Sequence, residues 1–381
     1  MRAAEPLWRP SETRKNEAPV SAFARRAEKL AGRSLPDYDA LHAWSVEDRE
    51  AFWSLVWDFC GVIGDRGERI LVDGERMPGA SFFPDARLNF AENLLRGSGS
   101  GDAVVFRGED KVERRLSWDA LRAQVSRLQQ LFRDRGLKAG DRVAAMMPNM
   151  PETLAAMLAA TSLGAVWSSC SPDFGIQGVL DRFGQIEPTV FIAPDGYWYG
   201  GKAFDVSDKT ATVLDKLPGV KLALIVDYLG NAREAAAKID RAEAYDEAVA
   251  GYEAGELAFE RLPFSHPLYI LFSSGTTGIP KCIVHSAGGT LLQHVKEHRL
   301  HAGLKPGDRL FYFTTCGWMM WNWLVSALST GATLLLYDGS PFHPNGNVVF
   351  DYLAAEKATF FGTSAKYIDA VRKAGLKPVE T

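Results

Sequence analysis

The fold is decided around Leu268-Tyr-Ile-Leu-Phe-Ser-Ser-Gly-Thr-Thr-Gly-Ile-Pro-Lys281. The apolar residues 268–272 have the length and composition of a buried strand. They are followed by small and hydroxyl-bearing residues that close on a single lysine. Gly275 and Gly278 permit positive φ, so successive backbone amides can converge on an anion, and the hydroxyls add donors. Together with the charge of Lys281, this run predicts a loop that binds phosphate.

Two other kinds of loop contain similar residues. An ordinary Gly-Thr turn between strands contains the same residue types, but the density of donors and the terminal lysine favour a phosphate loop. A Walker A loop also combines glycines, hydroxyls and lysine. It requires G-x-x-x-x-G-K-[ST], whereas here Gly278 precedes Lys281 by three positions and Cys282 follows it. The spacing therefore favours a different phosphate-binding architecture.

Short apolar runs alternate with amphipathic helices on both sides of the loop. Repeated β-α-β order predicts parallel strands, because parallel neighbours need helical crossovers. The sequence therefore predicts an α/β fold: a large domain of parallel sheets flanked by helices. We expect helices at 151–163 and 175–186, and strands at 142–147, 165–167, 189–193, 222–226, 268–272, 309–313, 333–336 and 359–361.

The N-terminal part has a different pattern. Ser45 stands as a helix N-cap before acidic residues, and apolar residues then recur at helical spacing through Phe59. The run Gly97-Ser-Gly-Ser-Gly101 is a flexible boundary signal. We therefore expect a leader and a small helical module over residues 1–98, and a larger domain over 99–381.

Composition excludes several classes of protein. The chain has 381 residues, 46% of them hydrophobic, with 43 Lys and Arg against 47 Asp and Glu. This balance is that of a globular protein and argues against a basic nucleic-acid surface or a polybasic membrane anchor. The sequence has no signal-like apolar run, so we expect a cytoplasmic location. The cysteines are far apart and we expect buried free thiols: Cys60, Cys170, Cys282 and Cys316.

Residues 269–281 resemble the phosphate-loop signature of the acyl-adenylate-forming (AMP-binding) superfamily. Trp53 to Leu94 resembles the N-terminal module of acetyl-CoA synthetases, and Gly317 to Trp323 most resembles the matching run of acetoacetyl-CoA synthetases. The resemblance implies ligation of acetoacetate to CoA through an acyl-adenylate, with ATP, Mg²⁺ and CoA as co-reactants. An acetyl- or other short-chain acyl-CoA synthetase is the alternative.

The resemblance also implies roles for individual residues. Thr276 and Lys281 would be catalytic. The ATP phosphates would be held by Ser273, Ser274, Gly275, Thr276, Thr277, Gly278 and Lys281. The acid would be lined by Trp318, Met319 and Met320, with the Asn322 amide or a Trp indole donating to its ketone oxygen. Lys202, after Gly200 and Gly201, would approach the nucleotide end of CoA, although such a turn is more often a solvated loop. No protein metal ligand is expected.

The run His294-Val-Lys-Glu-His298 supports a function of another class. It matches the H-x-x-E-H pattern of zinc metallopeptidases, with both histidines on one helical face. A zinc site would also need a third ligand, which this run does not supply. We therefore expect a solvated helix face here, with a metallopeptidase as the remote alternative.

The C-terminal end is the last feature of the sequence that bears on function. Members of the superfamily carry a Tyr-x-x-Thr-Glu-like segment, a ribose-binding Asp and a mobile C-terminal domain further along the chain. None of these occurs before Thr381. We therefore expect the chain to be the N-terminal part of a longer enzyme, inactive and aggregation-prone when alone.

Overall fold

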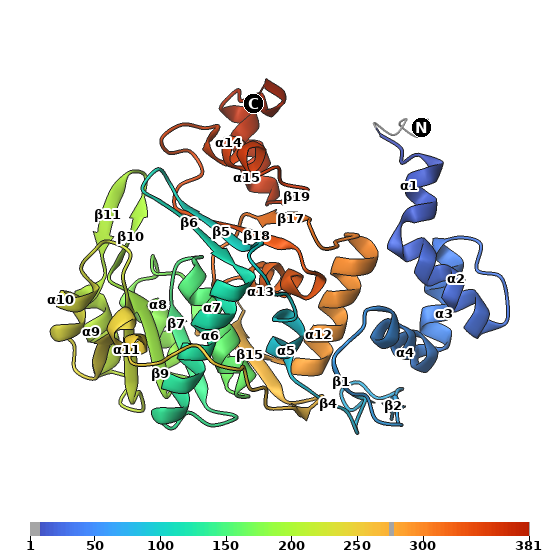
Figure 1. The fold of residues 1–381 in the computed structure, drawn as a ribbon, viewed down its shortest axis with the longest axis horizontal. Coiled ribbons are helices and arrows are strands. Elements are labelled where there is room, and N and C mark those ends of the chain that lie inside the picture. The colour runs from blue at the N-terminus through green and yellow to red at the C-terminus, as the bar shows by residue number, and fades with distance from the viewer. Residues whose placement is uncertain (1–7, 274–277, 381) are drawn as a thin grey trace.

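A computed structural model describes residues 8–273 and 278–380. The predicted loop residues Ser274, Gly275, Thr276 and Thr277 lie outside the described part. The rest is built on two large sheets with helices between them and on both outer sides (Figure 1), and three small sheets of two or three strands accompany them. The α/β class expected from the alternating pattern is confirmed.

The larger sheet has seven strands in the order β13-β12-β9-β7-β8-β15-β16. All neighbours are parallel except the hairpin of β15 and β16 at one edge. In sheet order, the bounds are Ala242–Ala244, Leu222–Val226, Val190–Pro194, Arg142–Met146, Val166–Cys170, Pro267–Phe272 and Cys282–Ser286.

The smaller sheet has five strands in the order β19-β17-β18-β5-β6. Its neighbours are parallel except for the edge hairpin of β5 and β6. In sheet order, the bounds are Phe360–Gly362, Arg309–Tyr312, Thr333–Asp338, Asp102–Gly108 and Val112–Ser117. Each of the eight strands expected from sequence overlaps a strand of one of these two sheets.

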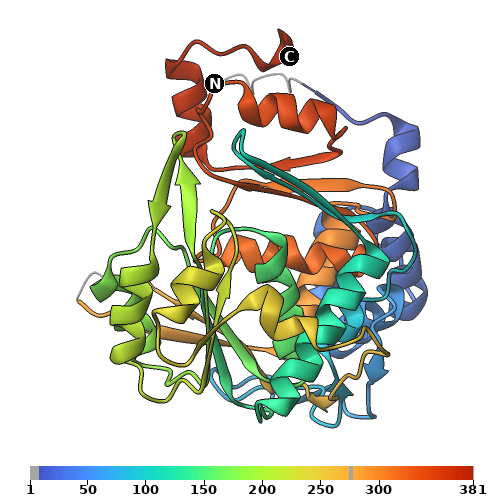
Figure 2. The same cartoon turned by 60° about the vertical axis from the view of Figure 1, so that its left-hand side comes forward.

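Both faces of each sheet are covered. In β7, Ala144 and Met146 pack with α8, α9 and α10, whereas Val143 and Ala145 face the central layer. The alternation follows from the two-residue period of a strand. Figure 2 shows the red helices α14 and α15 on the outer side of the smaller sheet. The helices of these outer layers are α8 Ile176–Phe183, α9 Ser207–Asp215, α10 Ala232–Ala237, α14 Val348–Ala355 and α15 Ala365–Lys373.

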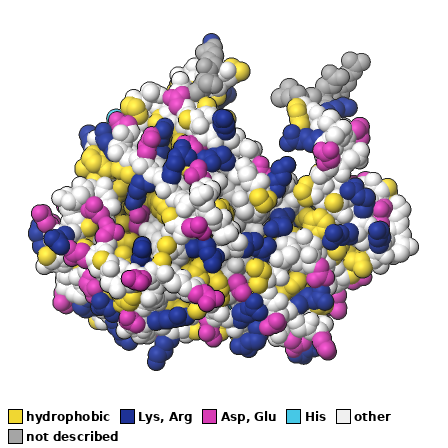
Figure 3. Space-filling view, viewed as in Figure 1, with side chains coloured by type: hydrophobic (Ala, Val, Ile, Leu, Met, Phe, Trp, Pro, Cys, Tyr) yellow, Lys and Arg dark blue, Asp and Glu magenta, His cyan; other side chains and the backbone are white. Residues whose placement is uncertain are grey.

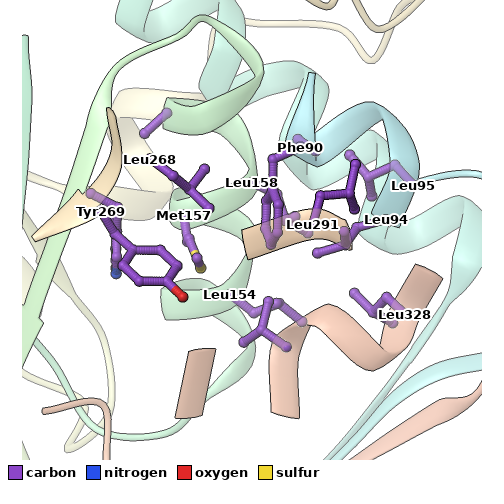
Figure 4. Packing of buried hydrophobic residues seen from close by; sticks show 14 of the residues in the cluster. Phe90, Leu94, Leu95, Leu154, Met157, Leu158, Leu268, Tyr269, Leu291 and Leu328 are labelled. Carbon is purple, nitrogen blue, oxygen red and sulfur yellow. The ribbon is translucent and has the colours of Figure 1, made fainter. Parts of the chain in front are cut away.

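The central layer holds the largest apolar core. Every residue of α7, Pro151–Ser162, is buried, as expected for a helix enclosed between two sheets. Its Leu154, Met157 and Leu158 meet side chains from β15, α5 and α12 (Figure 4). Burying one such leucine contributes about 1.5–3 kcal/mol. The central helices are α5 Phe90–Leu94, α6 Trp118–Asp134, α7, α12 Ala287–Lys296, the π-helical η1 Glu297–His301, α13 Met319–Ser326 and the 3-10 helix η2 Ala327–Thr330.

The N-terminal segment packs into the same core. Strand β4 pairs with β1 and with β14 of the larger region. The Asn89 amide donates to the carbonyls of Thr161, Ser162 and Glu260 at 2.8–3.1 Å. The division at residue 98 stays a prediction. The elements here are α1 Glu12–Glu17, α2 Pro19–Ala31, α3 Tyr38–Glu47, α4 Arg49–Phe59, β1 Gly64–Asp65, β2 Leu71–Val72, β3 Ser81–Phe82, β4 Arg87–Leu88 and β14 Leu262–Pro263.

The predicted N-cap at Ser45 is wrong. Ser45 lies inside α3, where its hydroxyl donates to the His42 carbonyl. The cap of α4 is Asp48, whose carboxylate accepts from the amide of Ala51 at 3.0 Å. Ser45 and Asp48 are both suitable N-cap residues and lie about one helical turn apart. The chain uses Asp48, the second of the two, as the N-cap of α4.

The remaining elements are the hairpin of β10 Gly196–Tyr199 and β11 Lys202–Asp205, the helix α11 Tyr245–Ala250 and the 3-10 turn η3 Pro378–Glu380. Acidic and basic side chains are interspersed over the face seen in Figure 3. In the described part of the chain, no helix combines the length and apolar character that crossing a bilayer requires.

A cleft of about 660 Å³ lies between α1 and the segment Leu300 to Asp308. The residues lining this cleft include none of the predicted site residues.

Candidate active site

The predicted phosphate loop connects β15 to β16. The last strand pair is Phe272 with Cys282. Beyond it, the Ser273 amide donates to the Lys281 carbonyl at 3.0 Å, and the Lys281 amide lies 3.3 Å from the Ser273 hydroxyl. These two residues close the neck of the loop. The structure therefore brings Ser273 and Lys281 together as the first and last residues of a hairpin connection.

The described end of the loop faces solvent. Gly278 and Lys281 are both exposed, and Gly278 has φ of +121°, which favours glycine. The Pro280 carbonyl accepts from the Gln185 side chain at 2.8 Å, so the loop is tied to the chain segment after α8. Strand β16 was not expected from sequence, although its Ile and Val are typical strand residues. An exposed lysine beside a restrained turn can approach a phosphate without first breaking internal contacts.

The run before α13 meets the ends of two strands of the larger sheet. The Ser169 hydroxyl donates to the Cys316 carbonyl at 2.8 Å, and the Cys316 thiol lies 3.2 Å from the Pro148 carbonyl oxygen. A side chain added at Gly317 would lie 3.6 Å from the backbone of Cys170. Carboxyl ends of strands from both sheets therefore converge here, which is where α/β sheets usually bind ligands.

The predicted acid-binding residues lie in the first turns of α13. Trp318 caps the helix and is 65% exposed, and Met319 is 41% exposed. Met320 is half-buried. Asn322 is fully buried; its amide nitrogen lies 3.4 Å from the Trp318 carbonyl oxygen, and its side-chain oxygen has no partner. The structure thus places the first three toward the outside and Asn322 toward the core, and their role in acid binding stays a prediction.

The other two tryptophans of this run are anchors. The Trp321 indole donates to the Asn149 side chain at 2.9 Å and stacks on Trp167 with ring centres 6.3 Å apart. Trp323 packs against Tyr312 and Phe360 with ring centres 5.9 Å away in both cases. Both tryptophans therefore pack against aromatic side chains of the central layer.

The turn that precedes Lys202 joins β10 to β11. Gly200 and Gly201 have φ of +62° and +76°, as a tight hairpin turn requires. Their amides donate to the carboxylate of Glu109 at 2.6 and 2.8 Å, and that of Ser340 donates at 2.7 Å. Lys202 is exposed at the start of β11. The turn is therefore anchored to the smaller sheet, while the role of Lys202 stays a prediction.

Sequence reasoning missed two residues that hold this region. Glu109 is buried, and its φ of +47° is not visible as a pattern in the sequence. Lys209 donates to the carbonyls of Pro172 and Phe174 at 2.5 and 3.0 Å, and burial lowers its pKa. It thereby fixes the loop after β8. No local pattern could have revealed either residue, because their partners lie far along the chain.

Asp338 ends β18 between the two sheets. The Tyr228 hydroxyl donates to its carboxylate at 3.1 Å. Loss of hydration raises the pKa of Asp338 to about 7, and the neighbouring Glu109 carboxylate pushes in the same direction. The carboxyl edge of the smaller sheet thus holds an acid that titrates near neutral pH.

The solvated-face interpretation of the histidine run is wrong. His294 and His298 are buried in the central layer, where burial lowers their pKa values to about 3 and about 4. Glu297 lies 2.8 Å from the Lys296 ammonium. Within the described ranges, one group of three side chains could jointly hold a metal, and it consists of Glu109, Asp110 and His343. The zinc alternative gains no support from this geometry.

Comparisons with known proteins agree with this arrangement. The sequence profile of AMP-binding enzymes matches residues 95–380, and that of the acetyl-coenzyme A synthetase N-terminus matches residues 38–94. The chain is 64% identical over all 381 residues to the acetoacetyl-coenzyme A synthetase of Rhizobium meliloti, of which it covers 58%. It is 42% identical to the Rattus norvegicus acetoacetyl-CoA synthetase over 98% of its own length and 57% of that relative.

A solved structure shows the same fold. The acetoacetyl-CoA synthetase from Streptomyces lividans superimposes with a TM-score of 0.92 at 41% identity, covering 99% of this chain and 58% of the other. The chain thus spans little more than half the length of the relatives it matches. The match of the AMP-binding profile over most of the sequence nevertheless settles the family, and the chain belongs to the AMP-binding enzymes.

Proposed function

We propose that this chain supplies the phosphate-loop and acid-binding part of an enzyme that joins acetoacetate to CoA at the expense of ATP. The observation that carries the proposal is the 64% identity, over the whole chain, to a relative named acetoacetyl-coenzyme A synthetase. The geometry adds that the phosphate loop and the start of α13 both follow carboxyl ends of strands.

In the first step, a carboxylate oxygen of acetoacetate attacks the α-phosphorus of ATP, and the bond to pyrophosphate breaks. The protein must hold two anions together while charge builds up on the phosphoryl oxygens. Lys281 is exposed at the loop neck beside Ser273, where its ammonium can offset that charge. The remaining loop residues, Ser274 to Thr277, are proposed to donate amides and hydroxyls to the phosphates.

In the second step, the CoA thiol sulfur attacks the acyl carbon of acetoacetyl-AMP, AMP leaves, and the thiol proton is released. Lys202 is proposed to bind phosphate of CoA. The exposed position of Lys202 and the rigid Gly200-Gly201 turn, held by Glu109, suit a cation that must stay in place without being buried.

For the acid, Trp318, Met319 and Met320 are proposed to form an apolar wall. The ketone oxygen of acetoacetate needs a donor, because an unpaired buried carbonyl costs about 1–3 kcal/mol. The Trp321 indole is already committed to Asn149. The proposed donors are therefore the Asn322 amide, whose present bond to the Trp318 carbonyl is long, and the exposed Trp318 indole.

ATP would arrive as its Mg²⁺ complex, and Mg²⁺ is commonly held by phosphates and waters rather than by a protein cage. Among the described residues, the one group that could jointly ligate a metal consists of Glu109 and Asp110 in the β5–β6 turn and His343, which follows β18. No step is assigned to the ion.

The test uses a chimaera in which residues 1–381 replace the matching part of the Rhizobium meliloti enzyme. We expect acetoacetate-dependent exchange of pyrophosphate into ATP, and acetoacetyl-CoA formation when CoA is added. Acetate and butyrate serve as comparison acids. Preference for acetate would favour the alternative of an acetyl-CoA synthetase. A folded chimaera that supports no exchange with any of these acids would refute the proposal.

A further inference from the structure

We propose that His298 is a positioning residue that holds α13 in place and thereby sets the selectivity of the acid site. The inference rests on the proposed function, because it assigns the acid to the first turns of α13. His298 belongs to the H-x-x-E-H run, whose chemistry the proposed reaction does not use.

His298 reaches α13 through a polar contact in the core. Its side chain is fully buried on η1, and Nε2 lies 2.9 Å from both the Trp323 carbonyl oxygen and the Ser326 hydroxyl. A carbonyl oxygen can only accept, so Nε2 carries the proton and donates. His298 is neutral at physiological pH, since burial lowers its pKa to about 4.

The Trp323 carbonyl is available because α13 tightens at its end. The amide of Ala327 donates to the carbonyls of Leu324 and Val325, as the chain passes into the 3-10 helix η2. The Trp323 carbonyl then accepts from two side chains, the Ser326 hydroxyl at 2.6 Å and His298. His298 therefore ties the end of α13 to a different helix of the central layer.

A second histidine extends the same connection. Nδ1 of His294 lies 2.9 Å from the Ser326 hydroxyl. Because that hydroxyl donates to the Trp323 carbonyl, it accepts from His294. Two histidines on the α12–η1 segment thus converge on one turn of α13, and Figure 1 shows these helices side by side.

Packing alone does not explain a histidine at this position. Nδ1 of His298 is buried and has no partner, which is unfavourable for a polar atom away from water. An apolar side chain of similar size would avoid this loss, and the Trp323 carbonyl would still have the Ser326 hydroxyl. What the histidine adds is a directed contact that fixes where Trp323 lies.

Movement at Trp323 would be transmitted to the acid site. The His298 and Trp323 rings have centres 4.2 Å apart. Met319 and Met320 lie four and three positions before Trp323, one helical turn away on the same side of α13. The other side of the helix is held by the bond from Trp321 to Asn149. Loss of His298 would leave the end of α13 held by His294 through Ser326 and by the packing of the Trp323 ring, without the direct bond to the Trp323 carbonyl that fixes its position.

The experiment compares His298→Leu with His298→Gln in the chimaera. Leucine keeps apolar bulk and removes the donor, whereas the glutamine amide can still donate to the Trp323 carbonyl. We expect His298→Leu to raise the KM for acetoacetate about tenfold, equivalent to about 1.4 kcal/mol, with the KM for ATP within about twofold of the parent. The preference for acetoacetate over acetate should fall, and His298→Gln should restore most of both properties. His301→Gln, at an exposed position of the same π-helix, is the matched control.

Several outcomes would overturn this inference. An active chimaera whose His298→Leu variant keeps its acid preference would do so, as would an equal rise in the KM values for ATP and acetoacetate. If the leucine variant does not fold, His298→Asn takes its place, because the asparagine side chain is too short to reach the carbonyl. A parent chimaera without acetoacetate-dependent exchange would instead refute the proposed function, and this inference with it.

Discussion

The phosphate loop and the histidine run lie on either side of β16, and the structure treats them in opposite ways. In the loop, Gly278 and Lys281 are exposed at a hairpin end. In the run, His294 and His298 are buried, and burial lowers their pKa values to about 3 and about 4. Both segments carry residue types associated with catalysis. The difference teaches that the available chemistry depends on hydration as much as on residue type.

Desolvation is the physical basis of this contrast. A charged group removed from water loses several kcal/mol unless a partner compensates for it. Lys281 is exposed, so its side chain can meet an anionic ligand. His294 and His298 have lost theirs, and they remain neutral donors that join helices.

The largest expected effect comes from Lys281→Ala in the chimaera. Removing a group that stabilises charge in a transition state typically costs about 100-fold or more in rate. We expect pyrophosphate exchange to fall by at least that factor. The free energy of unfolding should change by less than about 0.5 kcal/mol, because the side chain is exposed.

The control for this variant is Lys216→Ala, which removes an exposed lysine at the end of α9. It should leave both exchange and stability unchanged. If Lys281→Ala also leaves exchange unchanged, the Lys281 side chain has no part in the reaction. The proposed difference in function between the exposed loop and the buried histidine run would then be wrong.

A smaller effect is expected from acidification. The unfolded histidines bind protons below pH 6.5, whereas folded His298 stays neutral down to about pH 4. The unfolded state therefore binds more protons in this window, and the free energy of unfolding should fall as the pH drops from 6.5 to 4. His298 alone should contribute about 2–3 kcal/mol to this loss.

Urea unfolding at several pH values measures this dependence. His298→Gln should make the slope shallower, and the slope that remains is the sum of His294 and the other groups whose pKa values shift on folding, with Asp338 acting in the opposite direction. His42→Gln removes an exposed histidine of α3 and should leave the slope unchanged. An unaltered slope in His298→Gln would mean that His298 binds protons equally well in the folded and unfolded states. The proposed difference in hydration between the loop and the histidine run would then be wrong.

The contrast also shows how far sequence reasoning extends. The central strands were predictable because they are continuous apolar runs, and the phosphate loop because its signal is contiguous. The burial of His298 was not, since its partners Trp323 and Ser326 lie 25 and 28 positions further along the chain. A helical pattern identifies which residues share a face, and it does not identify what covers that face.

The same limit explains the other discrepancies. Glu109 meets Gly200 across 91 positions, so the anchored turn at Lys202 could not be distinguished from a solvated loop. The cap of α4 at Asp48 competes with a plausible cap at Ser45, and only packing of the two helices decides between them. Contacts distant in sequence therefore account for most of what had to come from the structure.

Thiol reactivity offers a finer test of exposure. The expectation of four buried thiols is wrong for Cys282, which is exposed next to Lys281. Burial raises the pKa of Cys60 to about 11 and of Cys170 to about 12, so these thiols resist deprotonation. Cys316 is buried as well.

We expect one equivalent of an aromatic disulfide reagent to react rapidly with the folded protein at pH 8, and three more after unfolding. Cys282→Ser should abolish the rapid phase and leave the slow phase unchanged. Rapid reaction of two or more thiols in the native protein would show that the region around the loop is more open than the structure indicates.

The last prediction is that the histidine run binds no zinc. Nδ1 of His294 and Nε2 of His298 are both engaged with Ser326, and Glu297 is paired with Lys296. Nδ1 of His298 has no partner, but among the described residues neither histidine belongs to a group of three side chains that could jointly hold a metal. Elemental analysis should therefore show no zinc that depends on Glu297. Stoichiometric zinc lost in Glu297→Gln would restore the metallopeptidase alternative. Zinc that survives this substitution and disappears in His343→Ala would be held by Glu109, Asp110 and His343, and it would leave the histidine run as a purely structural connection.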